Sequence, residues 1–424
     1  MRRIQAALLT SVLTLGAAVV TVPSAGASAA TSKAPIVVGG IATVAAFPGT
    51  DYGFEAGIRQ FNAAGGLDGR KIKFVGVLDD GGSPQTSLSD AQQLVQSDHV
   101  FAVAPFTSPV AGGDVGTFLA TNKTPFMGYA LNGAFLAAPT WGFGLNGQQV
   151  NPAYQSNAGA LQLAKALGGA STVKVAFVGT DVPGESNAVH SIAAISTAIG
   201  EHVTYAQASI PPAGVTSYAP YAQAIINSGA NAVYEILAAP DATGLAAAFK
   251  AAGWSGTVVN GVTYEPSVLA SQPNTKAALQ GVLVESEFPL NQNKSPAVAQ
   301  EEKELAALGQ STSLTPGVSV GYWTAQQFIQ MLQATEKSVG SAAKVTPAAL
   351  EKRVNGGWTY TDTLSGGIGS LSFPKDESEP TGCGTLVKTI GLSFKLLATY
   401  ACPPKGGIAV YHVTSAGKAT RLSS

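Results

Sequence analysis

The hydroxyl groups of Thr107 and Ser108 are the first side chains in this sequence that could bind a small molecule. They follow the apolar run Val100–Ala104 within the segment 104–109, APFTSP. Together with the backbone amides that open the next helix, these hydroxyls suit a carboxylate group. The alternative is that Thr107 or Ser108 simply caps that helix.

Patterns typical of catalysis, metal binding or nucleotide binding are missing. The sequence contains no GxSxG, HExxH or Walker pattern, and its four histidines are scattered. Residues 142–147 fit GxGxxG, but no clean strand precedes them and no acid follows about 20 positions later. We therefore expect no metal, no cofactor and no catalytic site.

The N-terminal residues predict export from the cell. Arg2 and Arg3 precede the apolar run Ala6–Val22, and 27–29 read Ala-Ser-Ala, so residues 1–29 are interpreted as a signal peptide. Without those two arginines, 22 basic residues remain against 25 acidic ones, a net charge of −3. This charge argues against nucleic-acid binding. We expect an extracellular, cell-wall or periplasmic location.

The two cysteines, Cys383 and Cys402, are predicted to form a disulfide because they lie 19 positions apart in an exported chain. The bond would hold the strand-like segment Thr385–Thr399 and stabilise the fold by roughly 3 kcal/mol in the chain-entropy model. Two unpaired thiols are the alternative.

The elements that must position these residues alternate between strands and helices. This alternation predicts parallel sheets covered by helices, in two α/β lobes. The predicted helices are Thr50–Ala64, Pro152–Leu167, Glu185–Ile199, Tyr218–Ser228, Asp241–Ala252 and an apolar helix at Gly321–Leu332. The predicted strands are Ile36–Ala42, Lys71–Leu78, Val100–Ala104, Thr124–Tyr129, Lys174–Val178, Val203–Ile210, Ala232–Leu237, Thr257–Val262 and Gly281–Ser286.

The segment Phe54–Val95 carries a family resemblance. It reads helix, Gly-rich turn, strand, acidic strand end and helix, and its run Asn62–Arg70 is NAAGGLDGR. This string resembles the type 1 periplasmic binding proteins, in particular the substrate-binding proteins of branched-chain amino acid and amide ABC transporters. The resemblance implies two lobes, each a parallel sheet with helices on both faces, and a ligand cleft between them.

The resemblance also implies that each lobe is built from separate parts of the chain. The first lobe would take residues 34–148 plus 290–365, and the second 150–285 plus 370–402. A C-terminal strand and tail would occupy 403–424. The chain would cross between the lobes at about 146–152, 287–293 and 366–369, where Gly and Pro can absorb a hinge motion.

In the first lobe, the resemblance assigns Thr107 and Ser108 to the acid group of the ligand, with Phe106 beside them. Ala130, Leu131 and Asn132 would form a second loop on the same side. Asn132 stands where the family more often has a small hydroxyl residue. Three further positions are assigned less directly: Phe47 as an apolar wall or plain turn, Tyr322 near the hinge or in the core, and Glu235 in the strand Ala232–Leu237.

In the second lobe, the resemblance places Val182, Pro183 and Ala238 at positions that often carry aromatic residues in amino-acid binders. Tyr264 and Glu265 match the loop whose carboxylate holds the ammonium group of the ligand, and Glu235 is the rival for that role. The missing aromatic residues weaken the case for a branched-chain amino acid. Small amides, carboxylates, modified amino acids and aromatic acids remain candidates.

The resemblance thus implies the solute-binding component of an ABC importer, which captures an amino acid, amide or small carboxylate by hinge closure. Its partners would be the solute and a membrane permease–ATPase complex, and we expect a monomer. An extracellular sensory module is the alternative, and a secreted hydrolase is a third hypothesis.

Overall fold

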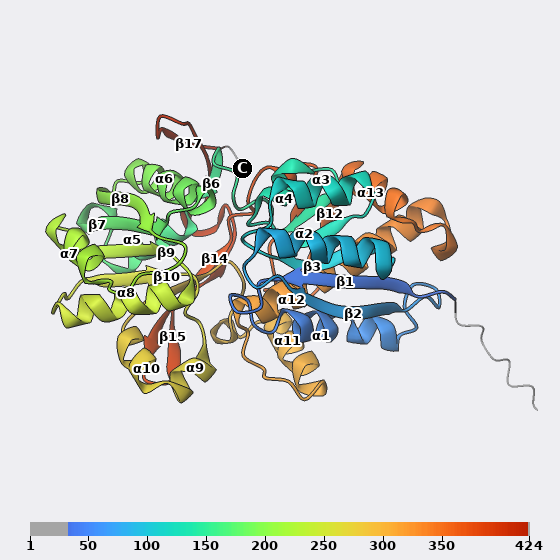
Figure 1. Cartoon of the computed structure of the whole chain (residues 1–424), viewed down its shortest axis with the longest axis horizontal. Helices are drawn as coiled ribbons and strands as arrows, with labels where there is room; N and C mark the ends of the chain where they lie inside the picture. The colour runs from blue at the N-terminus through green and yellow to red at the C-terminus, as the bar shows by residue number, and fades with distance from the viewer. Residues whose placement is uncertain (1–32, 423–424) are drawn as a thin grey trace, which may run out of the picture.

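The computed structural model describes residues 33–422, which form two lobes, each built on its own sheet (Figure 1). Lobe 1 surrounds a five-stranded sheet and lobe 2 a seven-stranded sheet. The predicted signal peptide, residues 1–29, lies outside the described residues. Within 33–422, no helix is long and apolar enough to cross a membrane.

The sheet of lobe 1 is entirely parallel, with strand order β2-β1-β3-β4-β5. Four of its strands were predicted. The fifth lies in the GxGxxG stretch, where four residues with two glycines give no strand signal. The strands are β1 (Ile36–Ala42), β2 (Ile72–Asp79), β3 (Ala102–Thr107), β4 (Phe126–Tyr129) and β5 (Gly142–Leu145).

The helices of lobe 1 come from both ends of the chain. Helix α12 crosses α1 so closely that a methyl group at Gly53 would lie 2.3 Å from the Val318 carbonyl oxygen, so only glycine fits there. The helices are α1 (Thr50–Ala63), α2 (Pro84–Gln92), α3 (Gly113–Thr121), α4 (Gly133–Ala137), α11 (Pro296–Ala307), α12 (Pro316–Val339) and α13 (Pro347–Asn355).

The hairpin of β12 (Trp358–Tyr360) and β13 (Leu371–Phe373) also belongs to lobe 1, because its residues share one core with β1, α1 and α12. β13 falls in the range 370–402 that the sequence assigned to the second lobe. Leu371 and Phe373 are buried in the lobe 1 core, so the passage to lobe 2 starts after β13.

The sheet of lobe 2 has the order β15-β14-β11-β10-β9-β7-β8. Its first five strands in the chain are parallel to one another, and the next strand pairs antiparallel both with the fifth strand and with the last one. The strands are β7 (Lys174–Thr180), β8 (His202–Ile210), β9 (Ala232–Ile236), β10 (Thr257–Asn260), β11 (Leu283–Ser286), β14 (Gly384–Ile390) and β15 (Ser393–Ala401). The helices are α5 (Ala158–Ala166), α6 (Pro183–Ala198), α7 (Ala219–Asn227), α8 (Ala239–Ala251), α9 (Pro266–Ser271) and α10 (Pro273–Leu279).

The predicted disulfide between Cys383 and Cys402 is present and joins the two ends of a hairpin. The sequence predicted one strand-like segment between the cysteines. The structure has two strands, β14 and β15, because Gly391 adopts a φ of +63° and reverses the chain.

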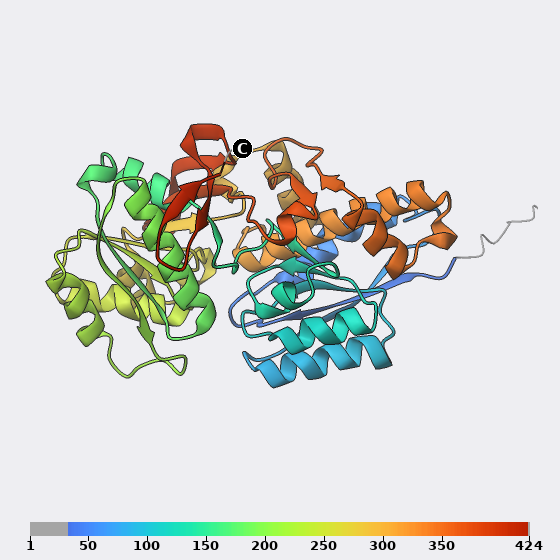
Figure 2. The same ribbon diagram turned by 90° about the horizontal axis from the view of Figure 1, so that it is seen from above.

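Three segments cross between the sheets, and Asn146 joins all three. Its side-chain amide donates to the Glu287 carbonyl at 3.1 Å, and its own carbonyl accepts from the Thr381 amide at 2.8 Å. The crossings run through residues 146–153, 287–295 and 374–383. A small sheet of β6 (Tyr154–Ser156), β16 (Val410–Val413) and β17 (Ala419–Arg421) lies over lobe 2 beside the junction (Figure 2).

Candidate functional site

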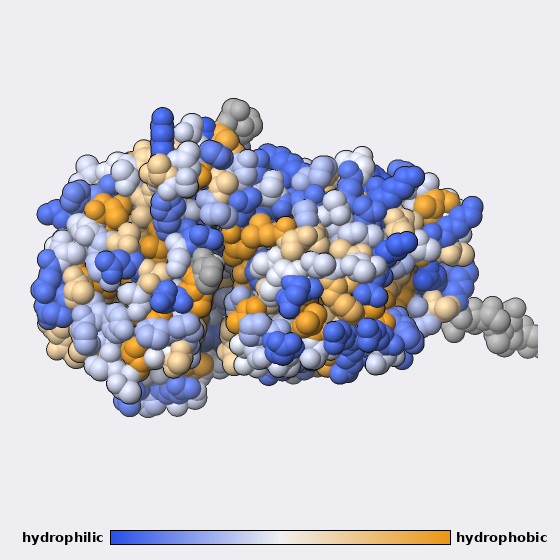
Figure 3. All heavy atoms as spheres, turned by 45° about the horizontal axis from the view of Figure 1, so that its top comes forward, coloured by the Kyte–Doolittle hydropathy of each residue, from blue (hydrophilic) through white to orange (hydrophobic). Residues whose placement is uncertain are grey.

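The carboxyl ends of both sheets open on the junction between the lobes. β5 and β11 each lead directly into a crossing, so the loops after their parallel neighbours lie at the same junction. In such sheets ligands bind beyond the carboxyl ends of the strands. A groove separates the lobes on the face shown in Figure 3, with apolar side chains along part of it.

A buried chain of hydrogen bonds fixes the position of Ser108. The Asp80 carboxylate accepts from the Ser87 hydroxyl at 2.6 Å and from the Thr43 hydroxyl at 2.7 Å. The Ser87 oxygen lies 3.2 Å from the Ser108 oxygen. Asn132 donates from its side-chain amide to the Ser108 carbonyl at 2.7 Å. All five residues are less than 9% exposed, so this chain fixes the strand ends of lobe 1.

The direction of these hydrogen bonds determines whether the Ser108 hydroxyl donates or accepts. A hydroxyl carries one proton, and Ser87 gives its proton to Asp80. The Ser87 oxygen must therefore accept, and Ser108 donates. Thr107 and Ser108, the two predicted carboxylate-binding residues, are both fully buried. Of these two hydroxyls, that of Thr107 has no hydrogen-bond partner within residues 33–422, whereas that of Ser108 has one.

Aromatic side chains line the lobe 1 side of the junction. Phe47 makes an edge contact with Tyr129 at a centroid distance of 6.1 Å, and Tyr129 makes another with Phe288 at 5.5 Å. Phe47 and Leu131 are both half-buried. Ala130 is buried. Burial, and next the nearby Glu287 carboxylate, raise the pKa of Tyr129 well above its usual range.

Two carboxyl groups at the second crossing, those of Glu285 and Glu287, lie near Tyr129. Burial raises the pKa of Glu287 to about 7, and hydrogen bonding with Tyr129 opposes this rise. Burial, and then the charge of Glu287, raise the pKa of Glu285 to about 8. The Glu285 carboxylate lies against the first turn of α5, where a methyl group at Gly159 would be 2.3 Å from its Oε2.

Glu265, predicted to bind an ammonium group, lies at the start of α9 and is half-buried. Burial raises its pKa to about 7. Its charge contributes to the raised pKa of Tyr52 on α1, after burial and Asp51. The carboxyl of Glu265 in lobe 2 therefore lies close enough to Tyr52 in lobe 1 for its charge to act on the Tyr52 hydroxyl.

Glu235, the rival of Glu265, is 2% exposed and belongs to the interior of lobe 2. One oxygen accepts from the Asn260 amide at 3.0 Å, and the other has no partner within the described residues. Burial raises the pKa of Glu235 well above its usual range, and the hydrogen bond from Asn260 opposes this rise.

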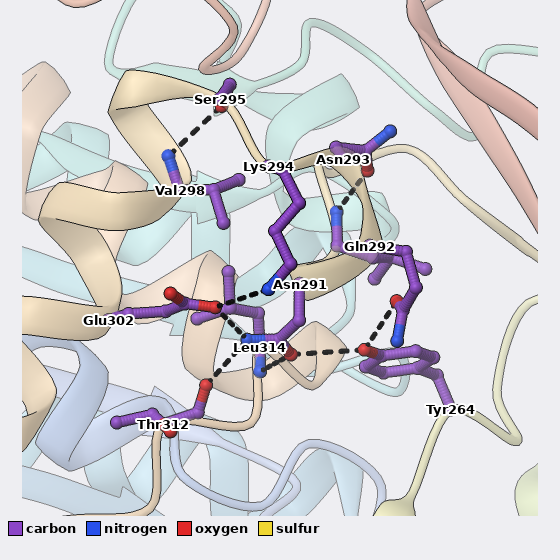
Figure 4. Close-up of polar contacts among 11 residues, drawn as sticks. Tyr264, Asn291, Gln292, Asn293, Lys294, Ser295, Val298, Glu302, Thr312 and Leu314 are labelled. Carbon is purple, nitrogen blue, oxygen red and sulfur yellow. Dashed lines mark hydrogen bonds and ion pairs between the residues drawn. The ribbon is translucent and has the colours of Figure 1, made fainter. Parts of the chain in front are cut away.

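Tyr264 links the loop after β10 to the second crossing (Figure 4). Its hydroxyl lies 2.8 Å from Gln292 Oε1 and 3.1 Å from Asn291 Oδ1. Asn291 in turn donates to Glu302 at 2.7 Å and accepts from the Leu314 amide at 2.9 Å. Tyr264 is 1% exposed, so it contributes to the connection between the lobes.

The remaining predicted site residues occupy helix starts and the core. Val182 precedes α6, Pro183 is the first residue of that helix, and Ala238 precedes α8. Phe106 packs in the lobe 1 core against Phe126 and Phe135. Tyr322 on α12 is 3% exposed and packs in the core.

Sequence reasoning missed Tyr129, Glu285 and Glu287 as site candidates. Tyr129 ends a predicted strand, and Glu287 begins a predicted crossing, so both positions were visible as strand ends. Their proximity depends on the crossing path, which no local pattern encodes. In residues 33–422, no group of three metal-binding side chains occurs.

Two lobes joined by three crossings, with polar loops at the junction, define a two-lobed binding protein. Residues 37–390 match the profile of the periplasmic binding protein family, and the chain belongs to this family. No curated protein matches the chain at a significant level.

Solved structures share the fold. A solute-binding protein of an ABC transporter from R. palustris, in complex with 4-hydroxybenzoate, is 22% identical with a TM-score of 0.68, over 88% of this chain and 99% of that chain. A fatty acid ABC transporter substrate-binding protein from Thermomonospora curvata is 17% identical with a TM-score of 0.68, over 87% and 91%. A branched-chain amino acid ABC transporter protein from Thermus thermophilus with bound valine is 13% identical with a TM-score of 0.67, over 88% and 97%.

Proposed function

We propose that this protein is the solute-binding component of an ABC importer and encloses a small polar solute between its lobes. The observation that carries this proposal is that the strand ends of both sheets lie at the junction of the lobes, where the charge of Glu265 in lobe 2 reaches Tyr52 in lobe 1. The family match and the titles of the similar structures support it. Binding alone suffices for this function, and no catalytic role is assigned. In this proposal each lobe consists of one sheet together with the helices and core residues that pack on it.

We further propose that the solute carries an amino group, as an amino acid does. The charges that act on the tyrosines of the junction, Tyr52 and Tyr129, are all acidic: Asp51, Glu265, Glu285 and Glu287. The pKa values of Glu265 and Glu287 are about 7, so both are partly charged at neutral pH, and a cationic group enclosed there would favour their ionised forms. The unpaired hydroxyl of Thr107 is the candidate donor for an acid group at the other end of the solute.

Thermal unfolding of residues 30–424 with a panel of solutes tests this function. The panel pairs amino acids with carboxylates that lack an amino group, and adds amides, polyamines and sugars. A solute at about 100 times its Kd stabilises the native state by roughly 2.7 kcal/mol, which raises the Tm by a few degrees. We expect amino acids to raise the Tm more than the matched carboxylates do.

Glu265→Gln tests the assigned carboxylate, with Glu55→Gln on the exposed face of α1 as the matched control. Loss of a charged partner in an enclosed site costs about 2 kcal/mol or more, so affinity should fall at least about 30-fold in the Glu265 variant. Unchanged affinity would discard the role of Glu265 and leave the binding function intact. A panel without any stabilising solute would contradict the binding function itself.

A further inference from the structure

The turn end of the hairpin β14–β15 presents lysine and large aliphatic side chains to solvent. Lys388 and Lys395 are direct neighbours across the two strands, and both are exposed. Ile390 is 47% exposed, Leu397 41%, and Leu392 at the turn 53%. We call these five residues the hairpin patch. Solvent-exposed aliphatic side chains grouped at one protruding turn are typical of a contact surface.

The charge around the hairpin patch is positive, although the whole chain has a net charge of −1. Glu379 is the last acidic residue of the sequence, and 380–424 contains five basic residues. Residues 266–284, which include α10, contain Lys276 and no acid. Among residues 33–422, the four ion pairs include none of Lys276, Lys388 and Lys395. Like charges directly opposite in a sheet repel, so an anionic partner would relieve this repulsion.

The hairpin turn is held in a fixed position. The Gln280 side chain at the end of α10 accepts from the Gly391 amide at 2.7 Å and donates to the Gly391 carbonyl at 2.9 Å. β15 is the edge strand of the lobe 2 sheet and runs to the lower end of this lobe between α9 and α10 (Figure 1). The patch is therefore presented at one end of the molecule without any need for folding on contact.

We propose that the hairpin patch docks the protein on a membrane surface that contains anionic phospholipid. The lysines would contact lipid headgroups, and Ile390 and Leu392 would enter the boundary between headgroups and acyl chains. A second copy paired edge to edge along β15 fits less well, because it would bring the lysines of both copies together. This docking does not depend on which solute the lobes enclose.

Sedimentation with lipid vesicles tests the proposal. The protein begins at residue 30, which removes the apolar N-terminal run and keeps every described element. Vesicles of equal parts phosphatidylglycerol and phosphatidylcholine are compared with pure phosphatidylcholine, at low and high salt. We expect binding to the anionic vesicles only, weakened by salt. Each lysine near such a surface strengthens binding about fivefold, so Lys388→Glu with Lys395→Glu should weaken it at least about 25-fold.

The matched control reverses Lys71 and Lys73, two exposed lysines at the edge strand β2 of lobe 1. Charge reversal keeps the edge strands charged, so aggregation does not mask the result. Leu392→Ser should weaken binding severalfold, whereas Val75→Ser on β2 should not.

Four outcomes overturn the proposal. They are no binding to anionic vesicles, equal loss in the β2 control, binding that free phosphate abolishes at constant ionic strength, and a dimer in light scattering that the hairpin variants dissociate. Thermal unfolding of each variant must match the parent for the comparison to count.

Discussion

Replacing Asp80 by alanine should destabilise lobe 1 strongly, because this buried carboxylate accepts three hydrogen bonds. The donors are the hydroxyls of Thr43 and Ser87 and the amide of Gly82. Asp80 is 1% exposed, so water cannot replace it without a change in packing. The hydroxyls of Thr43 and Ser87 are buried, whereas Gly82 is exposed, and each buried donor left without a partner costs about 1–3 kcal/mol, so the sum is about 2–5 kcal/mol. The Tm should fall by roughly 5 °C.

The asparagine variant of Asp80 makes the prediction sharper. The asparagine oxygen can still accept from Thr43 and Gly82, but its amide would donate to Ser87. Ser87 would then have to donate to Ser108, which reverses the hydrogen-bond chain. We expect a loss of about 1–2 kcal/mol, smaller than for alanine, together with altered solute affinity.

Asp79→Asn is the matched control, because the neighbouring carboxylate is exposed and accepts only from the amides of Val44 and Gly81. The assay is urea unfolding followed by tryptophan fluorescence and circular dichroism. Equal stability of the Asp80→Ala and Asp79→Asn variants would refute the buried chain as a support of the Ser108 loop.

Two further predictions concern the junction. Burial raises the pKa of Glu285 to about 8, so the folded state holds its proton longer than the unfolded state does. The stability that this proton contributes is complete below about pH 4.5 and is lost as the pH rises to about 8, by up to about 1.4 kcal/mol per pH unit. In Glu285→Gln the free energy of unfolding, measured in urea, should depend less on pH over this range. Tyr264→Phe removes the hydroxyl that bonds to Asn291 and Gln292 and should lower the free energy of unfolding by about 1 kcal/mol.

A different result would contradict each of the predictions for Glu285 and Tyr264. An unchanged pH slope in Glu285→Gln would mean that this carboxyl does not titrate abnormally. Tyr205→Phe is the control for Tyr264, because the Tyr205 hydroxyl bonds to Gln207 on an exposed strand. A loss in Tyr264→Phe no larger than in this control would remove Tyr264 from the connection between the lobes.

Most of the fold could be predicted from the sequence because its strands are apolar and separated by helical periods. All nine predicted strands overlap observed ones, and Ile36–Ala42 matches to the residue. The strand Gly142–Leu145 was missed because it is short and half glycine. The hairpin turn at Gly391 was missed because the residues on both sides have the same β-forming character.

The candidate site was less predictable. The sequence indicated the loops that hold Ser108 and Asn132, because strand ends can be read locally. The sequence could not show that the Ser108 hydroxyl is already hydrogen-bonded to Ser87, which in turn bonds to Asp80. These residues come together only because α2 packs on the sheet. The role of Glu287 likewise depends on the path of the second crossing.

The most direct test of the central claim is small-angle X-ray scattering of residues 30–424, with and without the solute that stabilises the protein most. If the lobes enclose a solute by hinge closure, the radius of gyration should fall on saturation, in step with binding measured by calorimetry. The tightest-binding solute leaving the radius of gyration and the scattering profile unchanged would contradict enclosure between the lobes.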